Sequence, residues 1–72
     1  MKNRVREYRA RYNYSQEKLA TMVGVTRQTI GFIEKEKMVP SVKLAIKIAR
    51  VFKCQVEQLF LMEEEMVNDE QI

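Results

Sequence analysis

Histidine and tryptophan are absent from this chain of 72 residues, and it contains a single cysteine, Cys54. One cysteine cannot close a disulfide within the chain. Without histidine there is no His/Cys zinc cluster and no Ser-His or Cys-His nucleophile pair. The sequence therefore argues against an enzyme and predicts no metal, no cofactor and no small-molecule ligand. A lone cysteine suits a reducing compartment, so we expect a cytoplasmic protein.

Long apolar runs are also missing. No stretch approaches the roughly 18 apolar residues that span a membrane, and no signal-peptide pattern is visible. A chain of this length predicts one domain, and a domain so small buries only about 60% of the surface that its unfolded chain exposes. We therefore expect a modest core and no membrane partner.

Charge is distributed very unevenly. All 13 lysines and arginines lie in residues 1–53, whereas five of the ten acids lie in residues 63–72. Residues 1–62 thus carry a net charge of +8 and residues 63–72 one of −5. The split predicts a folded domain over 1–62 and an acidic C-terminal tail over 63–72. A basic domain favours a polyanionic partner such as nucleic acid, with simple solvation of the charges as the alternative.

Apolar residues recur at helical spacing along the domain, with little sign of a strand. Ser15, Thr26 and Ser41 are good N-caps, and Gly24 lies where a helix end favours a left-handed residue. These signals predict five short helices, at about 3–12, 16–23, 27–36, 42–52 and 56–61.

The third predicted helix has two different faces on a helical wheel. Ile30 and Ile33 lie on the inward side, with Glu34 at its edge. A partly buried carboxylate needs a partner, and Arg9 of the first helix is the best candidate. The opposite side has two possible interpretations. It is an ordinary solvated face with one exposed phenylalanine, or it contacts base edges in DNA, whose hydrogen-bond donors and acceptors match those of arginine and glutamine side chains. This outward side comprises Arg27, Gln28, Gly31, Phe32 and Lys35.

Several spaced residues together resemble one known family. The run Ser15-Gln16-x-x-Leu19-Ala20-x-x-Val23-Gly24-Val25-Thr26-Arg27-Gln28-Thr29-Ile30-x-x-Ile33-Glu34, followed by Lys37 and Pro40-Ser41, is similar to the XRE, or Cro/phage-repressor, helix-turn-helix family. The resemblance covers about residues 3–61 and is closest to short stand-alone regulators. It implies an all-α, compact five-helix bundle of the repressor-like type, with a small β-segment after the last helix that pairs with the N-terminus.

The resemblance also implies a function. It suggests a sequence-specific, double-stranded-DNA-binding transcriptional regulator, a homodimeric repressor that reads a two-fold operator with the helix at about 27–36 in the major groove. It would act on the bacterial or archaeal nucleoid. The alternatives are the antitoxin of a toxin–antitoxin pair that also binds its own promoter, and an interaction module that has lost DNA binding.

Residue roles follow from the same resemblance. Arg9 and Glu34 match a structural salt bridge. The expected base contacts are Arg27, Gln28, Thr29 and Phe32. The expected DNA backbone contacts are Gln16, Lys35, Lys37 and Ser41. The segment Phe60-Leu61-Met62 is too apolar for a free tail, so it either caps the core or forms the dimer interface.

Two residues depart from the family pattern. The family usually has glycine where this chain has Glu36, and often where it has Lys53. Both are helix C-terminal positions that favour a left-handed backbone, which costs a residue with a Cβ roughly 1–2 kcal/mol unless the turn is formed differently. Glu36 also places a negative charge near the expected path of the DNA phosphates.

Overall fold

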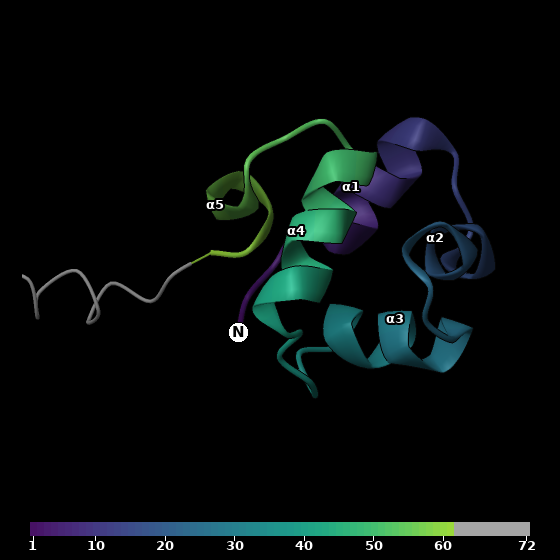
Figure 1. Cartoon of the computed structure of the whole chain (residues 1–72), viewed down its shortest axis with the longest axis horizontal. Coiled ribbons are helices and arrows are strands. Elements are labelled where there is room, and N and C mark those ends of the chain that lie inside the picture. The colour runs from purple at the N-terminus through teal and green to yellow at the C-terminus, as the bar shows by residue number, and fades with distance from the viewer. Residues whose placement is uncertain (62–72) are drawn as a thin grey trace, which may run out of the picture.

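The computed structural model describes residues 1–61, which form five helices and no strand (Figure 1). This architecture confirms the predicted all-α, repressor-like bundle. Met62 and the predicted acidic tail, with the boundary between tail and domain, lie outside the described residues. The helices are α1 (Val5–Tyr12), α2 (Gln16–Val23), α3 (Arg27–Glu34), α4 (Val42–Val51) and α5 (Val56–Leu59).

Three helices begin at the predicted side-chain caps. The hydroxyls of Ser15, Thr26 and Ser41 each accept a hydrogen bond from a backbone N–H in the first turn of α2, α3 and α4. Each cap satisfies a donor that the helix itself leaves unpaired. The starts of these helices are therefore encoded locally.

Four helices end in the same way, with a left-handed residue just past the helix. The N–H of the next residue then donates to the carbonyl five positions back, at 2.9–3.0 Å, as in a Schellman motif. This left-handed turn ends α3 at Glu34 and α4 at Val51, earlier than predicted from periodicity. The left-handed residues are Asn13 (φ 58°), Gly24 (φ 78°), Glu36 (φ 62°) and Lys53 (φ 54°), so both residues that replace the family's usual glycine do adopt the left-handed backbone.

The first helix begins at Val5, two residues later than predicted. Asn3 is responsible, because its Oδ1 accepts the N–H of Val5 at 3.1 Å and its Nδ2 donates to the carbonyl of Ile33 at 2.9 Å. Asn3 thereby fastens the N-terminal segment to the end of α3.

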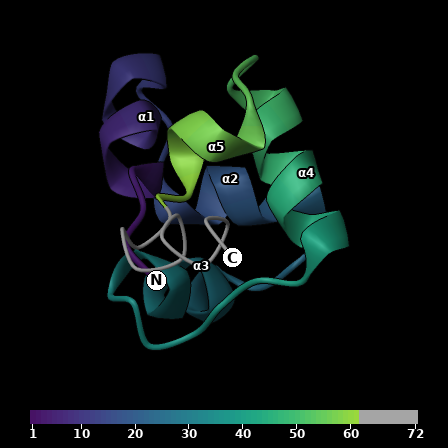
Figure 2. The same cartoon turned by 90° about the vertical axis from the view of Figure 1, so that its left-hand side faces the viewer.

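The N-terminal segment also pairs with the segment that follows α5 (Figure 2). An antiparallel bridge joins Asn3 to Phe60, and the N–H of Leu61 donates to the carbonyl of Lys2 at 2.8 Å. Because Phe60 is extended, α5 ends at Leu59 instead of the predicted residue 61. In the described residues, the expected β-segment is reduced to this single bridge.

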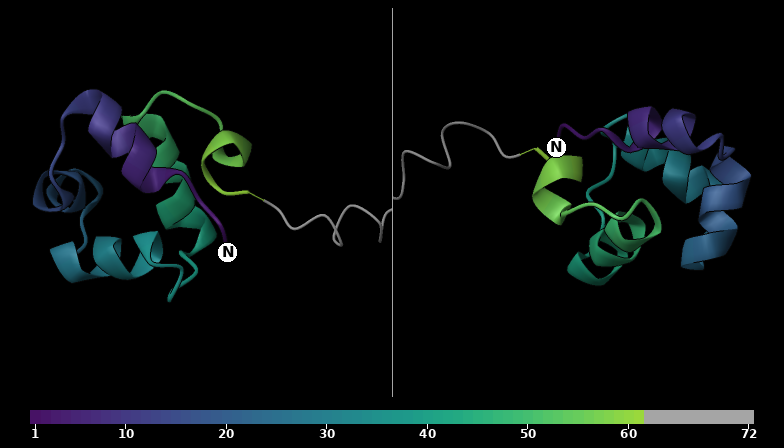
Figure 3. Two further views of the ribbon diagram at one scale, coloured as in Figure 1. Left: turned by 180° about the vertical axis from the view of Figure 1, so that it is seen from behind. Right: turned by 90° about the horizontal axis from the view of Figure 1, so that it is seen from above.

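The core lies between the helices and leaves one side of α3 uncovered (Figures 1 and 3). Phe52 is buried beneath the rings of Tyr8, Tyr12 and Tyr14, and its carbonyl accepts the Tyr12 hydroxyl at 2.8 Å. Within residues 1–61, no helix is long and apolar enough to cross a membrane. The remaining buried apolar residues are Val5, Leu19, Ala20, Val23, Ile30, Ile33, Leu44, Ala45, Ile48, Ala49, Leu59 and Phe60.

Candidate nucleic-acid interface

The inward side of α3 is anchored by apolar packing and by a partly buried ion pair. Ile30 and Ile33 are fully buried. The carboxylate of Glu34 accepts Arg9 Nε at 2.8 Å and Nη2 at 3.2 Å, and the two side chains are only 6% and 17% exposed. Arg9 Nη1 also donates to the carbonyl of Tyr14 at 3.0 Å. The ion pair expected between Arg9 and Glu34 is thus formed, and it fixes α3 against α1.

Gln16, at the start of α2, is tied to the same carboxylate. Its Nε2 donates to Glu34 Oε1 at 3.0 Å. The same nitrogen is the nearest atom to the space beside Gly31, 3.8 Å from where a Cβ would lie. One amide hydrogen of Gln16 remains available to a phosphate oxygen. The partly buried ion pair therefore orients a residue predicted to contact the DNA backbone, a link that the sequence did not suggest.

The outward side of α3 forms a shallow groove of about 260 Å³ with the start of α2. No acidic residue lines it. Phe32 is 49% exposed, although it is a large apolar residue. A basic, amide-bearing surface with an exposed aromatic ring suits a contact with a polyanion. The groove is lined by Gln16, Arg27, Gln28, Gly31, Phe32 and Lys35.

Thr29 is the predicted base-contacting residue that the structure does not bring into this groove. Its hydroxyl lies 3.0 Å from that of Thr26, which also accepts the Thr29 N–H at 3.2 Å. Thr29 is half-buried, and its hydroxyl takes part in capping the helix. Arg27, Gln28 and Phe32 are therefore grouped together, with Thr29 turned toward the start of α3.

Basic residues also lie on the other side of the α2–α3 turn. Ser41, Lys43 and Lys47 line a hollow of about 210 Å³ together with Gly24. The predicted residue, Ser41, caps α4 by accepting the Leu44 N–H at 3.1 Å. Lys43 and Lys47 were not predicted from the sequence to belong to the interface. Their spacing of four residues in a capped helix could have indicated that they lie one helical turn apart on the same face.

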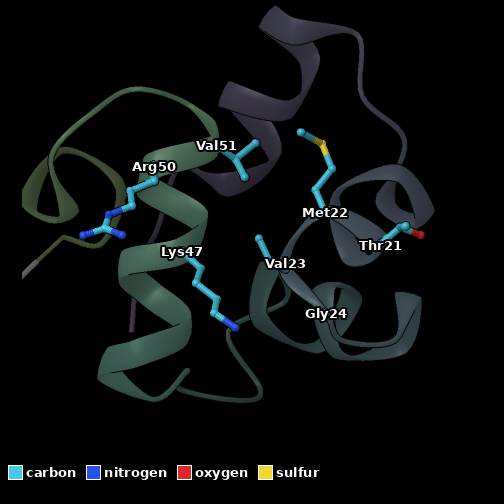
Figure 4. A pocket seen from close by; sticks show the side chains of 7 residues that line it. All are labelled: Thr21, Met22, Val23, Gly24, Lys47, Arg50 and Val51. Carbon is cyan, nitrogen blue, oxygen red and sulfur yellow. The ribbon is translucent and has the colours of Figure 1, made fainter.

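A larger hollow of about 510 Å³ adjoins this one, between the end of α2 and α4 (Figure 4). Lys47 extends from α4 toward the turn at Gly24, whereas Arg50 points away from that turn. Met22 lines the same hollow and is 45% exposed. On α4, the side chain of Lys47 therefore lies next to the helix-turn-helix, whereas that of Arg50 points away from it.

The turn after α3 presents alternating charges to solvent. Lys35, Glu36 and Lys37 are all exposed, and the Lys37 N–H donates to the Phe32 carbonyl at 2.9 Å. Arg6 of α1 shares a second hollow with Lys35 and Gln16. Glu36 is therefore an acid placed among the basic residues predicted to contact phosphates.

The predicted dimer residues have different surroundings. Phe60 is only 4% exposed and packs into the core of its own chain, so little of it is left to meet a partner. Leu61 is half-buried and Met62 lies outside the described residues.

Cys54 offers no clear chemistry. It is half-buried, and burial raises the pKa of its thiol, an effect that a hydrogen bond with Tyr8 and the charge of Arg11 partly oppose. A raised pKa keeps the thiol protonated and less reactive at neutral pH. Residues 1–61 contain no cluster of three or more His, Cys, Asp or Glu side chains that could hold a metal.

Comparison with known proteins agrees with this geometry. The helix-turn-helix family matches residues 5–59, so the chain belongs to that family. It is 57% identical over 65 residues to the HTH-type transcriptional regulator YgzD of Bacillus subtilis, covering 90% of this chain and 98% of the relative. An HTH-type transcriptional regulator of Archaeoglobus fulgidus is 54% identical over 65 residues, covering 90% and 92%.

Solved structures show the same arrangement of helices. The restriction-modification controller protein C.AhdI of Aeromonas hydrophila aligns with a TM-score of 0.73 and 32% identity, over 79% of this chain and 86% of that one. The P22 c2 repressor, solved in complex with a synthetic operator, shares the fold with a TM-score of 0.73 at 24% identity, over 75% and 82%.

These findings confirm the XRE-type family predicted from the sequence. The protein is a transcriptional regulator with a helix-turn-helix DNA-binding fold, and not an enzyme. Its relatives occur in both bacteria and archaea.

Proposed function

We propose that this protein is a sequence-specific repressor that binds double-stranded DNA as a homodimer, with α3 in the major groove. The observation that carries the proposal is the uncovered face of α3, where Arg27, Gln28 and Phe32 surround Gly31. Arginine and glutamine carry the paired donors and acceptors that distinguish guanine and adenine, and an apolar side chain can contact a thymine methyl. Gly31 lets the helix backbone approach the bases closely.

Contacts to phosphates would position the reading helix. Gln16 and Lys35 line the α3 groove, and Ser41 lines the hollow at the start of α4 together with Lys43. This arrangement suits a helix that enters a groove between two phosphate backbones. Thr29 would contribute less than its neighbours, because its hydroxyl already bonds within the helix cap. Affinity should then fall steeply as salt rises.

The proposed regulatory mechanism is occlusion of promoter DNA. A dimer would place its two α3 helices in half-sites about one turn of DNA apart, roughly 34 Å, on a two-fold symmetric operator. The assignment of repression draws support from the P22 c2 repressor, which shares this fold. This function would place the protein in the cytoplasm, on the nucleoid. An antitoxin that binds its own promoter would use the same interface, and an adjacent toxin-like reading frame would favour that alternative.

Two substitutions test the proposal by separating specificity from affinity. Gln28→Ala should cost about 1–3 kcal/mol at one base pair and relax the preference there. Lys37→Ala should weaken all sequences alike and lower the salt slope by about 1. Lys53→Ala removes the same charge at the far end of α4 and is the matched control. Fluorescence anisotropy with operator variants measures all three, and an unchanged base preference in Gln28→Ala would contradict the assignment of the reading face.

A further inference from the structure

The outward side of α4 carries three cations in a row, which we call the basic side of α4. Lys43, Lys47 and Arg50 follow one another at intervals of four and three residues, so they lie within about 60° of one another around the helix. All three are exposed, and like charges at these intervals destabilise a helix. An acidic partner on the basic side of α4 would therefore stabilise the domain.

No acid of the described domain fills this role. The ion pairs within residues 1–61 both involve α1, and neither includes a residue of α4. The hollow of about 510 Å³ between α2 and α4 is lined by Lys47 and Arg50, and no acid of the described part of the chain belongs to its lining (Figure 4). Its apolar lining includes Met22, which is exposed, and Val51, which is half-buried. The hollow thus combines positive charge with apolar surface.

The acidic tail, residues 63–72, has the complementary composition. Its sequence is EEEMVNDEQI, with three acids before Met66 and Val67 and two acids after them. It contains neither lysine nor arginine. Opposite charges attract, and apolar groups leave water together. An acidic segment with an apolar pair in its middle therefore matches a cationic hollow with an apolar lining.

The chain beyond α5 is long enough to reach this hollow. Helix α4 packs against both α5 and α2 and lies between them (Figure 1). The way from the end of α5 to the hollow is two helix spacings, or about 16–20 Å. The 11 residues at 62–72 span up to about 36–40 Å when extended. A segment that takes this path crosses the outward side of α4, where the three cations lie.

We propose that the acidic tail docks on the basic side of α4 of its own chain, with Met66 and Val67 against the hollow between α2 and α4. DNA phosphates are the other polyanion that could neutralise these cations. However, Arg50 points away from the turn between α2 and α3, so a duplex held by α3 would not neutralise it. A segment that approaches from α5 can meet all three cations.

Docking of the tail would compete with DNA. Lys43 lines the hollow beside Ser41, and Lys47 extends toward the turn at Gly24 (Figure 4). Phosphates that approach these lysines must displace the tail. The tail should therefore weaken the binding of operator and nonspecific DNA by the same factor, and salt should reduce that factor because it screens the attraction. This consequence rests on the function proposed above, whereas the docking itself does not.

The docking is tested without DNA, in the full-length protein. A neutral-tail variant carries Glu63→Gln, Glu64→Gln, Glu65→Gln, Asp69→Asn and Glu70→Gln. In amide proton–nitrogen correlation spectra at low salt, it should differ from the wild type at residues 21–24 and 43–51. These differences should shrink at roughly 0.5 M salt, where the Debye length is only about 4 Å. Differences confined to residues 60–72 would overturn the proposal, and so would differences that grow with protein concentration, which indicate docking between copies.

The apolar pair is tested separately. Met66→Gln with Val67→Gln keeps every charge of the tail, and it should still alter the amide signal of Met22. An unaltered Met22 signal would refute the placement of Met66 and Val67 against the hollow.

Competition is tested by anisotropy titration of a nonspecific duplex at about 50 mM salt. The neutral tail should tighten binding about five- to tenfold. Since loss of negative charge strengthens DNA binding wherever it occurs, the decisive variant is Arg50→Gln. Removing a cation should weaken binding, but here it releases the tail, so affinity should rise about twofold with the natural tail and should not rise with the neutral tail. Lys18→Gln is the matched control, because Lys18 is exposed on α2 and lines neither hollow, and it should not tighten binding with either tail.

The outcomes separate this inference from the proposed function. An Arg50→Gln variant that weakens DNA binding equally with both tails would overturn the competition. Altered α4 signals together with no sequence preference in the wild type would refute the function and keep the docking. A clear sequence preference with unaltered α4 signals would refute the docking and keep the function.

Discussion

Gly31→Ala should make the protein more stable and a poorer DNA binder. Glycine inside a helix costs about 1 kcal/mol relative to alanine. At Gly31 the added Cβ would meet nothing closer than Gln16 Nε2 at 3.8 Å, which is an ordinary van der Waals contact. No packing penalty therefore offsets the gain in helix stability. In a domain of this size, about 1 kcal/mol raises the melting temperature by roughly 4–8 °C.

The same methyl group would project into the groove of α3, between the base-reading side chains and Gln16. It should keep the helix from its closest approach to the bases and lower operator affinity about tenfold or more, or about 1.4 kcal/mol. Thermal unfolding followed by circular dichroism measures the first effect. Anisotropy titrations with operator and nonspecific duplexes at one salt concentration measure the second.

Gly24→Ala is the matched control, because it adds the same atom at the other glycine of the chain. Its Cβ would meet nothing within 4 Å, but its φ of 78° penalises alanine, so this variant should lose about 1–2 kcal/mol of stability. A Gly31→Ala variant that gains stability and keeps its operator affinity would refute the clearance role of Gly31. A variant that loses stability would refute the helix argument itself.

The remaining predictions concern the strained helix end and the partly buried ion pair. Glu36→Gly should add about 0.5–1 kcal/mol in urea unfolding, since relief of a left-handed φ outweighs the entropy that glycine adds to the unfolded chain, and it should tighten nonspecific DNA binding at low salt. Lys53→Gly should gain the same stability without tighter binding, and a loss of stability in both variants would contradict the strain argument. Arg9→Met should cost about 2–3 kcal/mol because it leaves the largely buried Glu34 carboxylate without its cation and with Gln16 as its remaining side-chain donor, and adding Glu34→Met should restore most of the loss. A cost below about 1 kcal/mol for Arg9→Met would show that the pair does not hold α3 in place.

Features that depend on local chemistry could be predicted from the sequence. A serine or threonine cap acts within one turn, so Ser15, Thr26 and Ser41 marked the starts of three helices. The period of a helix separated the two sides of α3 and placed Glu34 near Arg9. The resemblance showed that Glu36 stands where the family usually has glycine, but whether the turn there is left-handed was left open until the structure gave a φ of 62°.

Features that depend on distant segments could not be predicted. Asn3 delays the start of α1 because it bonds to Ile33 and pairs with Phe60, which lie 30 and 57 positions along the chain. The bond from Gln16 to Glu34 requires the packing angle between α2 and α3, which no periodicity gives. The exposure of Val42 and Ile46 escaped prediction because periodicity shows that they share a side of α4, not whether another helix covers it.

Selection of binding sites from random duplex DNA by the purified full-length protein tests the central claim most directly. We predict one enriched motif with two-fold symmetry, whose half-sites are centred about one turn of DNA apart, and we predict that Gln28→Ala flattens the preference at one symmetric pair of positions. An enriched motif without symmetry would contradict the proposal that the protein binds DNA as a two-fold dimer. The absence of any enriched motif would contradict the proposal that α3 recognises base sequence.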